Sequence, residues 1–369
     1  MPQTHKALRL KSFDAPLAVE DTETPTAGPG STVVQILAAQ VVSYVRKLYS
    51  GNLYPLEIPL VTGSSAVGRV ASVGPDAALL KPGQLVIVDA KIAARDDPTQ
   101  QILSGMHAGN SDSSRQLMKG EWRDSSYAEM MKAPLESVFP LNEDILLNKL
   151  GYKIEELTYI LRQLIPMGGL FDLDIKAGDR VIVAPATGAF SGAGVEVACA
   201  LGATVIAAAR NVDKLKQMQK AIGVERVQVV QFTGDVAEDA KALQQFGAVD
   251  AYLDLSPPAA AKSTHFLACI LALREGGKAC FMGGVTENLS LPYGLIMFKN
   301  LQLRGRYMYS REAVERIIRL VESGMLKLGS AAGLSVAGPF GLGEWEEAFA
   351  EAEKQTGWGV QVVISPGKK

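Results

Sequence analysis

The feature that most constrains this chain is a regular alternation of strand-like and helix-like segments that begins at residue 178. The predicted strands are Arg180–Ala184, Thr204–Ala208, Val227–Val230, Ala251–Asp254, Lys278–Met282 and Leu301–Arg304. Helical segments lie between most of them, for example Gly192–Leu201 and Val212–Ile222. Because strand–helix–strand connections cover both faces of a parallel sheet with helices, this part is predicted to be α/β, with a doubly wound parallel sheet.

The rest of the chain has a different texture. Before residue 90, predicted strands at 33–38, 67–73 and 85–88 are separated by turns rich in Gly and Pro, so this part is predicted to be β-rich. Residues 91–125 are polar with weak periodicity, which indicates either a functional excursion or a mobile loop. A helical pattern follows near residue 154, and a last strand is predicted at 360–364. At 369 residues, two domains are expected.

Charge and cysteine content narrow the function classes. The formal net charge is −2, which gives no reason to expect nucleic acid or an anionic membrane as a partner. Cys199, Cys269 and Cys280 form no CxxC pair and lie in apolar stretches, which favours small core residues in a reducing compartment. The N-terminal residues contain no apolar signal core. We therefore expect a soluble cytoplasmic protein.

A small-residue turn follows the first strand of the alternating region. Residues 181–194 read as strand, turn and helix start, and a second strand ends about 20 residues later. Phosphate oxygens need close backbone approach and unpaired N–H groups, which such a turn supplies. The turn predicts a dinucleotide site with contacts from Thr187, Gly188, Ala189, Phe190 and Ser191. The alternative is a structural turn that binds nothing.

The end of the second strand bears on which dinucleotide binds. No Asp or Glu stands there to accept a hydrogen bond from a ribose 2′-hydroxyl. Arg210 offers a forked guanidinium, Asn211 follows it, and Lys214 lies one helical turn further on. These residues predict NADP(H) in preference to NAD(H), with both cations reaching one point. The alternative is that both are solvated surface cations.

Short motifs spread over almost the whole chain resemble the medium-chain dehydrogenase/reductase superfamily, which includes zinc alcohol dehydrogenases and quinone oxidoreductases. These motifs are Thr62–Val70, Lys81–Gly83, Gly178–Val181, Leu201–Ala203, Gly276–Lys278 and Lys299–Leu301. The resemblance implies a GroES-like β-rich catalytic domain, interrupted by a Rossmann domain that binds the nucleotide. We expect the catalytic domain at 1–164 and 306–369, and the Rossmann domain at 165–305.

The sequence departs from the zinc enzymes of that family at the metal positions. Ser64 and Ser65 stand where those enzymes have His-Glu, residues 42–44 lack their first zinc Cys, and residues 91–125 contain no Cys. Zinc needs about three or four S, N or carboxylate ligands in a fixed cage, so neither zinc is expected. His107, the one nearby His, is expected at the surface. Family members usually have Gly where Pro185 and Ser191 stand.

Without zinc, a proton donor must stabilise the charge that develops on the substrate. Tyr54 is the first candidate, because residues 50–55 resemble a segment that faces the nicotinamide in quinone and enoyl reductases; Tyr44 is the second. The alternative for either is an aromatic packing role. By position, the resemblance also implies cofactor contacts from Ser43, Ser256, Pro257, Met282 and Gly283.

We therefore expect a zinc-independent, NADPH-dependent reductase of a small, uncharged carbonyl compound or activated alkene. An enone or quinone is favoured, since a bare ketone benefits most from a Lewis acid. Two alternatives stay open: an alcohol dehydrogenase-like carbonyl reductase that uses Tyr54, and a non-catalytic NADPH-binding homologue. The resemblance also implies a homodimer joined through the last strand of the Rossmann sheet, near residues 289–304.

Overall fold

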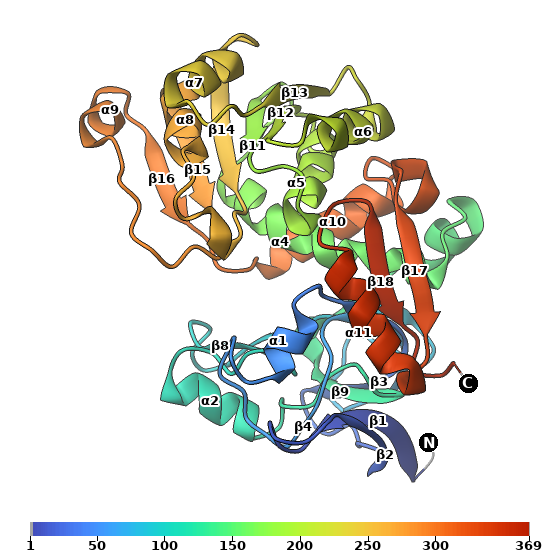
Figure 1. Cartoon of the computed structure of the whole chain (residues 1–369). Coiled ribbons are helices and arrows are strands. Elements are labelled where there is room, and N and C mark those ends of the chain that lie inside the picture. Colours follow the sequence, from blue (N-terminus) through green and yellow to red (C-terminus); the bar gives the residue numbers. More distant parts are fainter. Residues whose placement is uncertain (1–2, 369) are drawn as a thin grey trace. The chain divides into compact units, whose positions relative to one another are not determined.

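The computed structural model describes residues 3–368 and contains two compact units (Figure 1). The first unit comprises Met1–Leu161, Ser335–Thr356 and Val360–Lys369, and the second comprises Arg162–Leu334 and Gly357–Gly359. Residues 306–334, which the sequence assigned to the catalytic domain, have their contacts in the second unit. The reason is close packing: a Cβ at Gly168 would lie 2.2 Å from the carbonyl oxygen of Met308.

The second unit contains a six-stranded parallel sheet in the order β13-β12-β11-β14-β15-β16, which confirms the predicted fold class. The strands are β11 (Arg180–Val183), β12 (Thr204–Ala209), β13 (Val227–Gln231), β14 (Val249–Asp254), β15 (Leu273–Phe281) and β16 (Gln302–Gly305). The helices are α4 (Tyr159–Asp172), whose first turn lies in the first unit, α5 (Ala189–Ala200), α6 (Val212–Ile222), α7 (Val236–Gln244), η3 (Pro258–Ala260), α8 (His265–Ala272), α9 (Tyr293–Phe298), α10 (Arg311–Glu322) and η4 (Gly329–Ala332).

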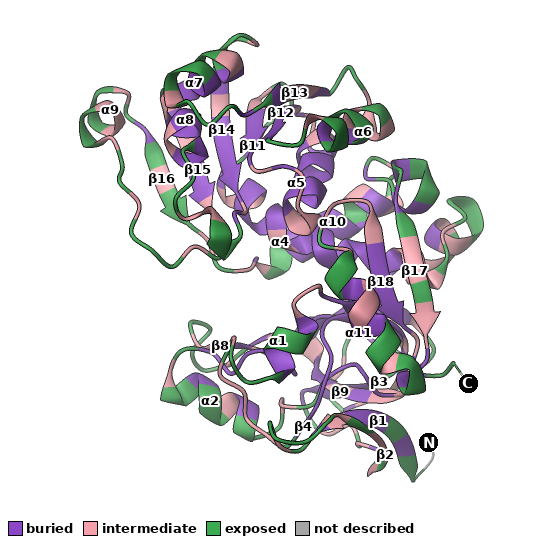
Figure 2. Ribbon diagram, in the orientation of Figure 1, coloured by how far each residue is buried: buried purple, intermediate pink, exposed green. Residues whose placement is uncertain are grey.

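The core of this sheet lies in its central strands, which are almost entirely buried (Figure 2). One apolar cluster joins residues of β11, β12 and β14, among them Ile182, Ile206 and Tyr252, to Ile270 of α8. The strand order reverses at β11, which lies between β12 and β14. In open α/β sheets, ligands bind beyond the carboxyl ends of the strands at such a reversal.

The first unit is built on a seven-stranded sheet in the order β10-β6-β5-β3-β18-β17, with β9 also paired to β3. Its strands are β3 (Ser31–Val41), β5 (Ala66–Val73), β6 (Leu85–Val88), β9 (Met130–Pro134), β10 (Val138–Pro140), β17 (Ser335–Phe340) and β18 (Val360–Ile364). A three-stranded sheet contains β1 (Thr4–Leu10), β2 (Ala18–Glu23) and β4 (Leu60–Val61). The helices are α1 (Val45–Tyr49), η1 (Leu135–Ser137), the π-helix η2 (Asp144–Lys149), α3 (Ile154–Leu157), η5 (Leu342–Glu344) and α11 (Trp345–Lys354).

The polar stretch 91–125 is folded rather than irregular. It forms a hairpin of β7 (Lys91–Ala93) and β8 (Gln101–Leu103) and the helix α2 (Asp112–Lys119). Four buried apolar side chains form its own small core: Ile92, Ile102, Ala108 and Met118. Because this small core needs few apolar residues, the stretch shows only weak periodicity in the sequence.

The three cysteines are unpaired, and Cys269 and Cys280 are buried as predicted. Burial raises the pKa of the half-buried Cys199 thiol to about 12, so it carries no thiolate at neutral pH. Among residues 3–368, no helix combines the length and the apolar character needed to cross a membrane.

Candidate functional site

The predicted phosphate turn lies at the carboxyl end of β11 and leads into α5. Gly188 is the N-cap residue of this helix, and its N–H donates to the Ser191 hydroxyl oxygen over 3.2 Å. The first N–H groups of a helix have no intrahelical acceptor, so those of Ala189 and Phe190 can meet an anion there. The geometry thus fits the diphosphate of a dinucleotide.

Ser191, one of the predicted cofactor contacts, also holds the turn from within the protein. Its side chain is buried, and its oxygen accepts the Gly188 N–H, so the hydroxyl stabilises the turn from within. Thr187 is half-buried, and its carbonyl accepts the N–H of Trp358 over 3.1 Å. The turn is therefore held by groups on both of its sides.

The cations beyond β12 lie in different surroundings. Arg210 is exposed and has no ion-pair partner among residues 3–368. Asn211 is the N-cap of α6, and its side-chain oxygen accepts the N–H of Lys214 over 3.1 Å. The Lys214 ammonium lies 3.4 Å from the position that a Cβ would take at Gly357. Lys214 is thus directed toward the segment that borders the phosphate turn.

The loops after β14 and β15 contain the other predicted cofactor residues of this unit. Pro257 is exposed, whereas Ser256 is buried. A Cβ at Gly283 would lie 2.5 Å from the carbonyl oxygen of Ser256, so only glycine allows these two loops to approach. The sulfur of Met282 would lie 2.5 Å from a Cβ at Gly169 on α4, so Met282 fills space against that helix.

A buried polar network that was not predicted from the sequence fixes the loop after β14. The Ser256 hydroxyl donates to Asp254 Oδ1 over 2.5 Å and contacts His265 Nε2 over 2.9 Å. Tyr252 donates to the same carboxylate oxygen, and Ser263 contacts His265 Nδ1. The Ser256 side chain is therefore occupied within the protein. An Asp-x-Ser sequence at the end of a buried strand was the available signal.

In the first unit, the loop after α1 places Tyr54 beside His107. Their ring centroids lie 4.6 Å apart, and Tyr54 is 37% exposed. Burial raises the pKa of the Tyr54 phenol, so it remains protonated and able to donate at neutral pH. Its partial exposure leaves one side open to a reactant.

His107 is 7% exposed, so the expectation of a surface position is wrong. The excursion 91–125 packs against the Tyr54 loop, where Ala108 N–H donates to the Pro55 carbonyl over 2.8 Å. Burial lowers the pKa of His107, which favours the neutral imidazole at pH 7. Its Nδ1 accepts the Gly109 N–H over 2.8 Å.

Tyr44, the second proton-donor candidate, is the N-cap residue of α1 and is half-buried, as is Ser43 beside it. Burial raises the pKa of both Tyr49 and Tyr127, and the proximity of Tyr44 raises them further. The Tyr127 hydroxyl donates to the Gln40 carbonyl over 2.9 Å. Tyr44 thus lies near two buried phenols, those of Tyr49 and Tyr127.

The serines at the family's metal positions are engaged in hydrogen bonds. Ser64 donates to the Gln40 carbonyl over 3.0 Å, and Ser65 donates to Asp89 Oδ1 over 3.1 Å. Within residues 3–368, no three His, Cys, Asp or Glu side chains gather as a metal site would require. The residues present therefore do not fit a zinc cage.

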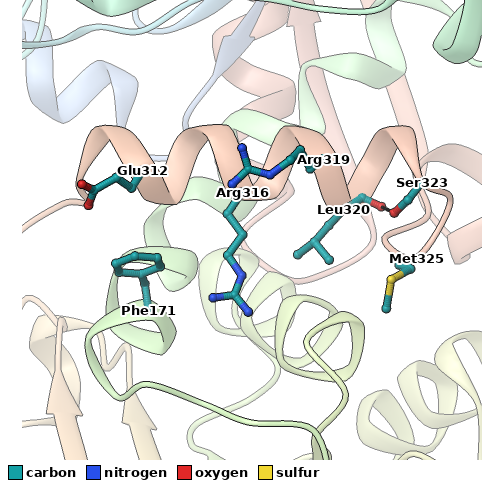
Figure 3. Close-up of a pocket in the computed structure, with 7 residues that line it drawn as sticks. All are labelled: Phe171, Glu312, Arg316, Arg319, Leu320, Ser323 and Met325. Carbon is teal, nitrogen blue, oxygen red and sulfur yellow. Dashed lines mark hydrogen bonds between the residues drawn. The ribbon is translucent and has the colours of Figure 1, made fainter.

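A separate hollow of about 560 Å³ lies between α4 and α10 of the second unit (Figure 3). Arg316 extends from α10 toward the ring of Phe171. The hollow is lined by Phe171, Glu312, Arg316, Arg319, Leu320, Ser323 and Met325. None of them is a predicted site residue, so this hollow is distinct from the phosphate turn.

Two segments of the chain match two known families. The alcohol dehydrogenase GroES-like domain matches residues 28–143, and the zinc-binding dehydrogenase family matches residues 191–323. The L-threonine 3-dehydrogenase of Chromobacterium violaceum is 22% identical over 330 residues, covering 87% of this chain and 89% of that protein.

The fold is similar to those of solved structures over nearly the whole chain. A crotonyl-CoA carboxylase/reductase superposes with a TM-score of 0.79 at 16% identity, covering 99% of this chain and 89% of that one. A zinc-binding dehydrogenase of Sinorhizobium meliloti 1021, solved with NADP bound, gives a TM-score of 0.76 at 21% identity, covering 99% and 100%. The chain belongs to the medium-chain dehydrogenase/reductase superfamily of oxidoreductases.

Proposed function

We propose that this protein is a zinc-independent, NADPH-dependent reductase of a small, uncharged carbonyl compound or activated alkene. The observation that carries the proposal is the exposed, unpaired guanidinium of Arg210 just after β12, where neither of the last strand residues, Ala208 and Ala209, is acidic. The NADP bound to the Sinorhizobium relative and the reductase name of the crotonyl-CoA relative support it.

In this proposal, separate residues of the chain bind the cofactor and donate the proton. The N–H groups of Ala189 and Phe190 hold the diphosphate, and Arg210 binds the 2′-phosphate. When bound, NADPH supplies the hydride. Tyr54 donates the proton that the reduced substrate needs, with Tyr44 as the second candidate donor. An enone or quinone is the favoured substrate class, because hydrogen-bond donors alone must polarise it.

A panel of enones, quinones and simple ketones, offered with NADPH and with NADH, tests this function. The proposal expects turnover of enones or quinones with NADPH. Turnover of simple ketones alone would favour an alcohol dehydrogenase-like carbonyl reductase. Binding of NADPH without turnover of any compound would favour a non-catalytic homologue.

Metal content gives a separate prediction. Because Ser64 and Ser65 are hydrogen-bonded where relatives have ligands, the purified protein should contain much less than one zinc per chain. Dialysis against a chelator should leave turnover unchanged, as elemental analysis and an NADPH oxidation assay would show. About one tightly held zinc per chain, lost together with activity, would contradict the proposal.

We also propose a homodimer joined through β16, an edge strand of the sheet. Tyr293 is 82% exposed and Phe298 is 78% exposed, both on the neighbouring α9, which is largely exposed in Figure 2. An unpaired edge beside exposed apolar side chains favours a symmetric partner. Light scattering at micromolar concentration should give the dimer mass.

The variant Phe298→Asp should shift the mass toward the monomer, because a charge would be buried in the interface. The matched control is Met325→Asp, which changes an exposed apolar side chain on the α10 hollow and should leave the dimer intact. A monomeric wild-type protein would reject this interface.

A further inference from the structure

The short segment Gly357–Gly359, called here the hook, borders the phosphate turn. The chain on either side of it belongs to the first unit, but the hook itself has its contacts in the second. The backbone N–H of Trp358 donates to the Thr187 carbonyl over 3.1 Å, and Gly357 forms an isolated antiparallel bridge with Gly188. The hook therefore restrains the backbone of the turn directly.

The indole of Trp358 anchors the hook on α5. Its Nε1 donates to Glu196 Oε1 over 2.5 Å, while Gln163 Nε2 donates to Glu196 Oε2 over 2.8 Å. Glu196 is 5% exposed. A buried carboxylate is costly unless donors meet it, so Glu196 strongly favours conformations in which the indole stays in place.

Glycine at position 192, which closes the first turn of α5, leaves room for the indole. A Cβ there would lie 2.6 Å from the Cβ of Trp358, a distance at which something must move. The absence of a side chain at Gly192 thus lets Trp358 lie against the helix whose first turn faces the phosphate. The hook, the turn and α5 form one restrained assembly.

From these contacts we infer that Trp358 and Glu196 are positioning residues for the diphosphate of the nicotinamide cofactor. N–H groups bind an anion well when they already point at it, because no ordering is then needed on binding. The hook provides this order at Thr187 and Gly188. The Lys214 ammonium lies near Gly357 of the hook, where it adds positive charge. The inference deepens the proposed function and rests on its nicotinamide cofactor.

The first test is Trp358→Phe, which removes the indole N–H and keeps an aromatic ring. The dissociation constants of NADPH and NADH should both rise about tenfold, the effect of losing one hydrogen bond to a charged group. Binding of adenosine 2′-monophosphate, which lacks the diphosphate, should change less than about twofold. Trp345→Phe on α11 is the matched control and should alter none of these values.

A second variant tests the partner carboxylate. Glu196→Gln keeps the size but can no longer accept from both Trp358 and Gln163, so dinucleotide affinity should fall in the same direction. The double variant should be no weaker than the weaker single variant, since both remove one interaction. Additive losses, or an unchanged dinucleotide affinity in Trp358→Phe, would overturn the inference.

The outcomes separate this inference from the choice of NADPH. If the wild-type protein prefers NADH, the NADPH proposal fails, yet the effect of Trp358→Phe on NADH still decides the role of the hook. A protein that binds neither dinucleotide would overturn both. Equal weakening of adenosine 2′-monophosphate and NADPH in Trp358→Phe would indicate a general structural role and would also overturn the inference.

Discussion

Replacing Tyr54 by phenylalanine is expected to lower kcat by about a hundredfold and to leave the KM for NADPH nearly unchanged. A positioned general acid contributes about 10² to 10⁴ in rate, and the partial exposure of Tyr54 places it at the lower end. Phenylalanine retains the ring contact with His107, so the variant removes only the proton donor. Steady-state kinetics with the best substrate of the panel measures the effect.

The dependence of kcat on pH tests the role of Tyr54 independently. Burial raises the pKa of Tyr54 above its ordinary value, so the wild-type kcat should stay constant through neutral pH and fall only above about pH 10. Tyr44→Phe is the matched control, and it should alter kcat much less. If Tyr44→Phe abolishes turnover while Tyr54→Phe does not, the two phenols exchange roles.

Replacing Arg210 by alanine is expected to erase most of a preference for NADPH over NADH of about tenfold to a hundredfold. A hydrogen bond to a charged group contributes about 1.5–3 kcal/mol, and neither Ala208 nor Ala209 at the end of β12 is an acid that would oppose it. Because NADH lacks the 2′-phosphate, its affinity should remain nearly unchanged. Titration of both dinucleotides against wild type and variant measures the preference.

Lys216→Ala is a suitable control, since it removes another exposed cation from α6. It should change neither affinity by more than about twofold. Lys214→Ala should weaken both dinucleotides, because its ammonium lies beside the hook. Equal affinity of the wild-type protein for NADPH and NADH would remove the role assigned to Arg210.

Much of the fold could be predicted because local patterns carry it. The strand at 85–88, the helix at 212–222 and the strand at 360–364 have the bounds that the sequence indicated. Each depends on periodicity and on turn residues within a few positions. The end of β12 likewise shows its lack of an acid in the sequence alone.

The parts that could not be predicted depend on contacts between distant residues. His107 was expected at the surface because its neighbours are polar, but packing against the Tyr54 loop buries it. The Rossmann domain was predicted to end at 305, but the second compact unit continues to Leu334, because residues 308–309 pack on Gly168. No local pattern reports such packing.

The sequence by itself determined the strand–helix alternation, the phosphate turn and the cation beyond the second strand, since these follow from residue order and side-chain chemistry. Only the tertiary structure decided which groups hold the turn. Glu196 and Trp358 are 162 positions apart, and each is unremarkable in its own segment. The physical reason is burial: a carboxylate removed from water must find donors, and the fold alone determines which donors lie within reach.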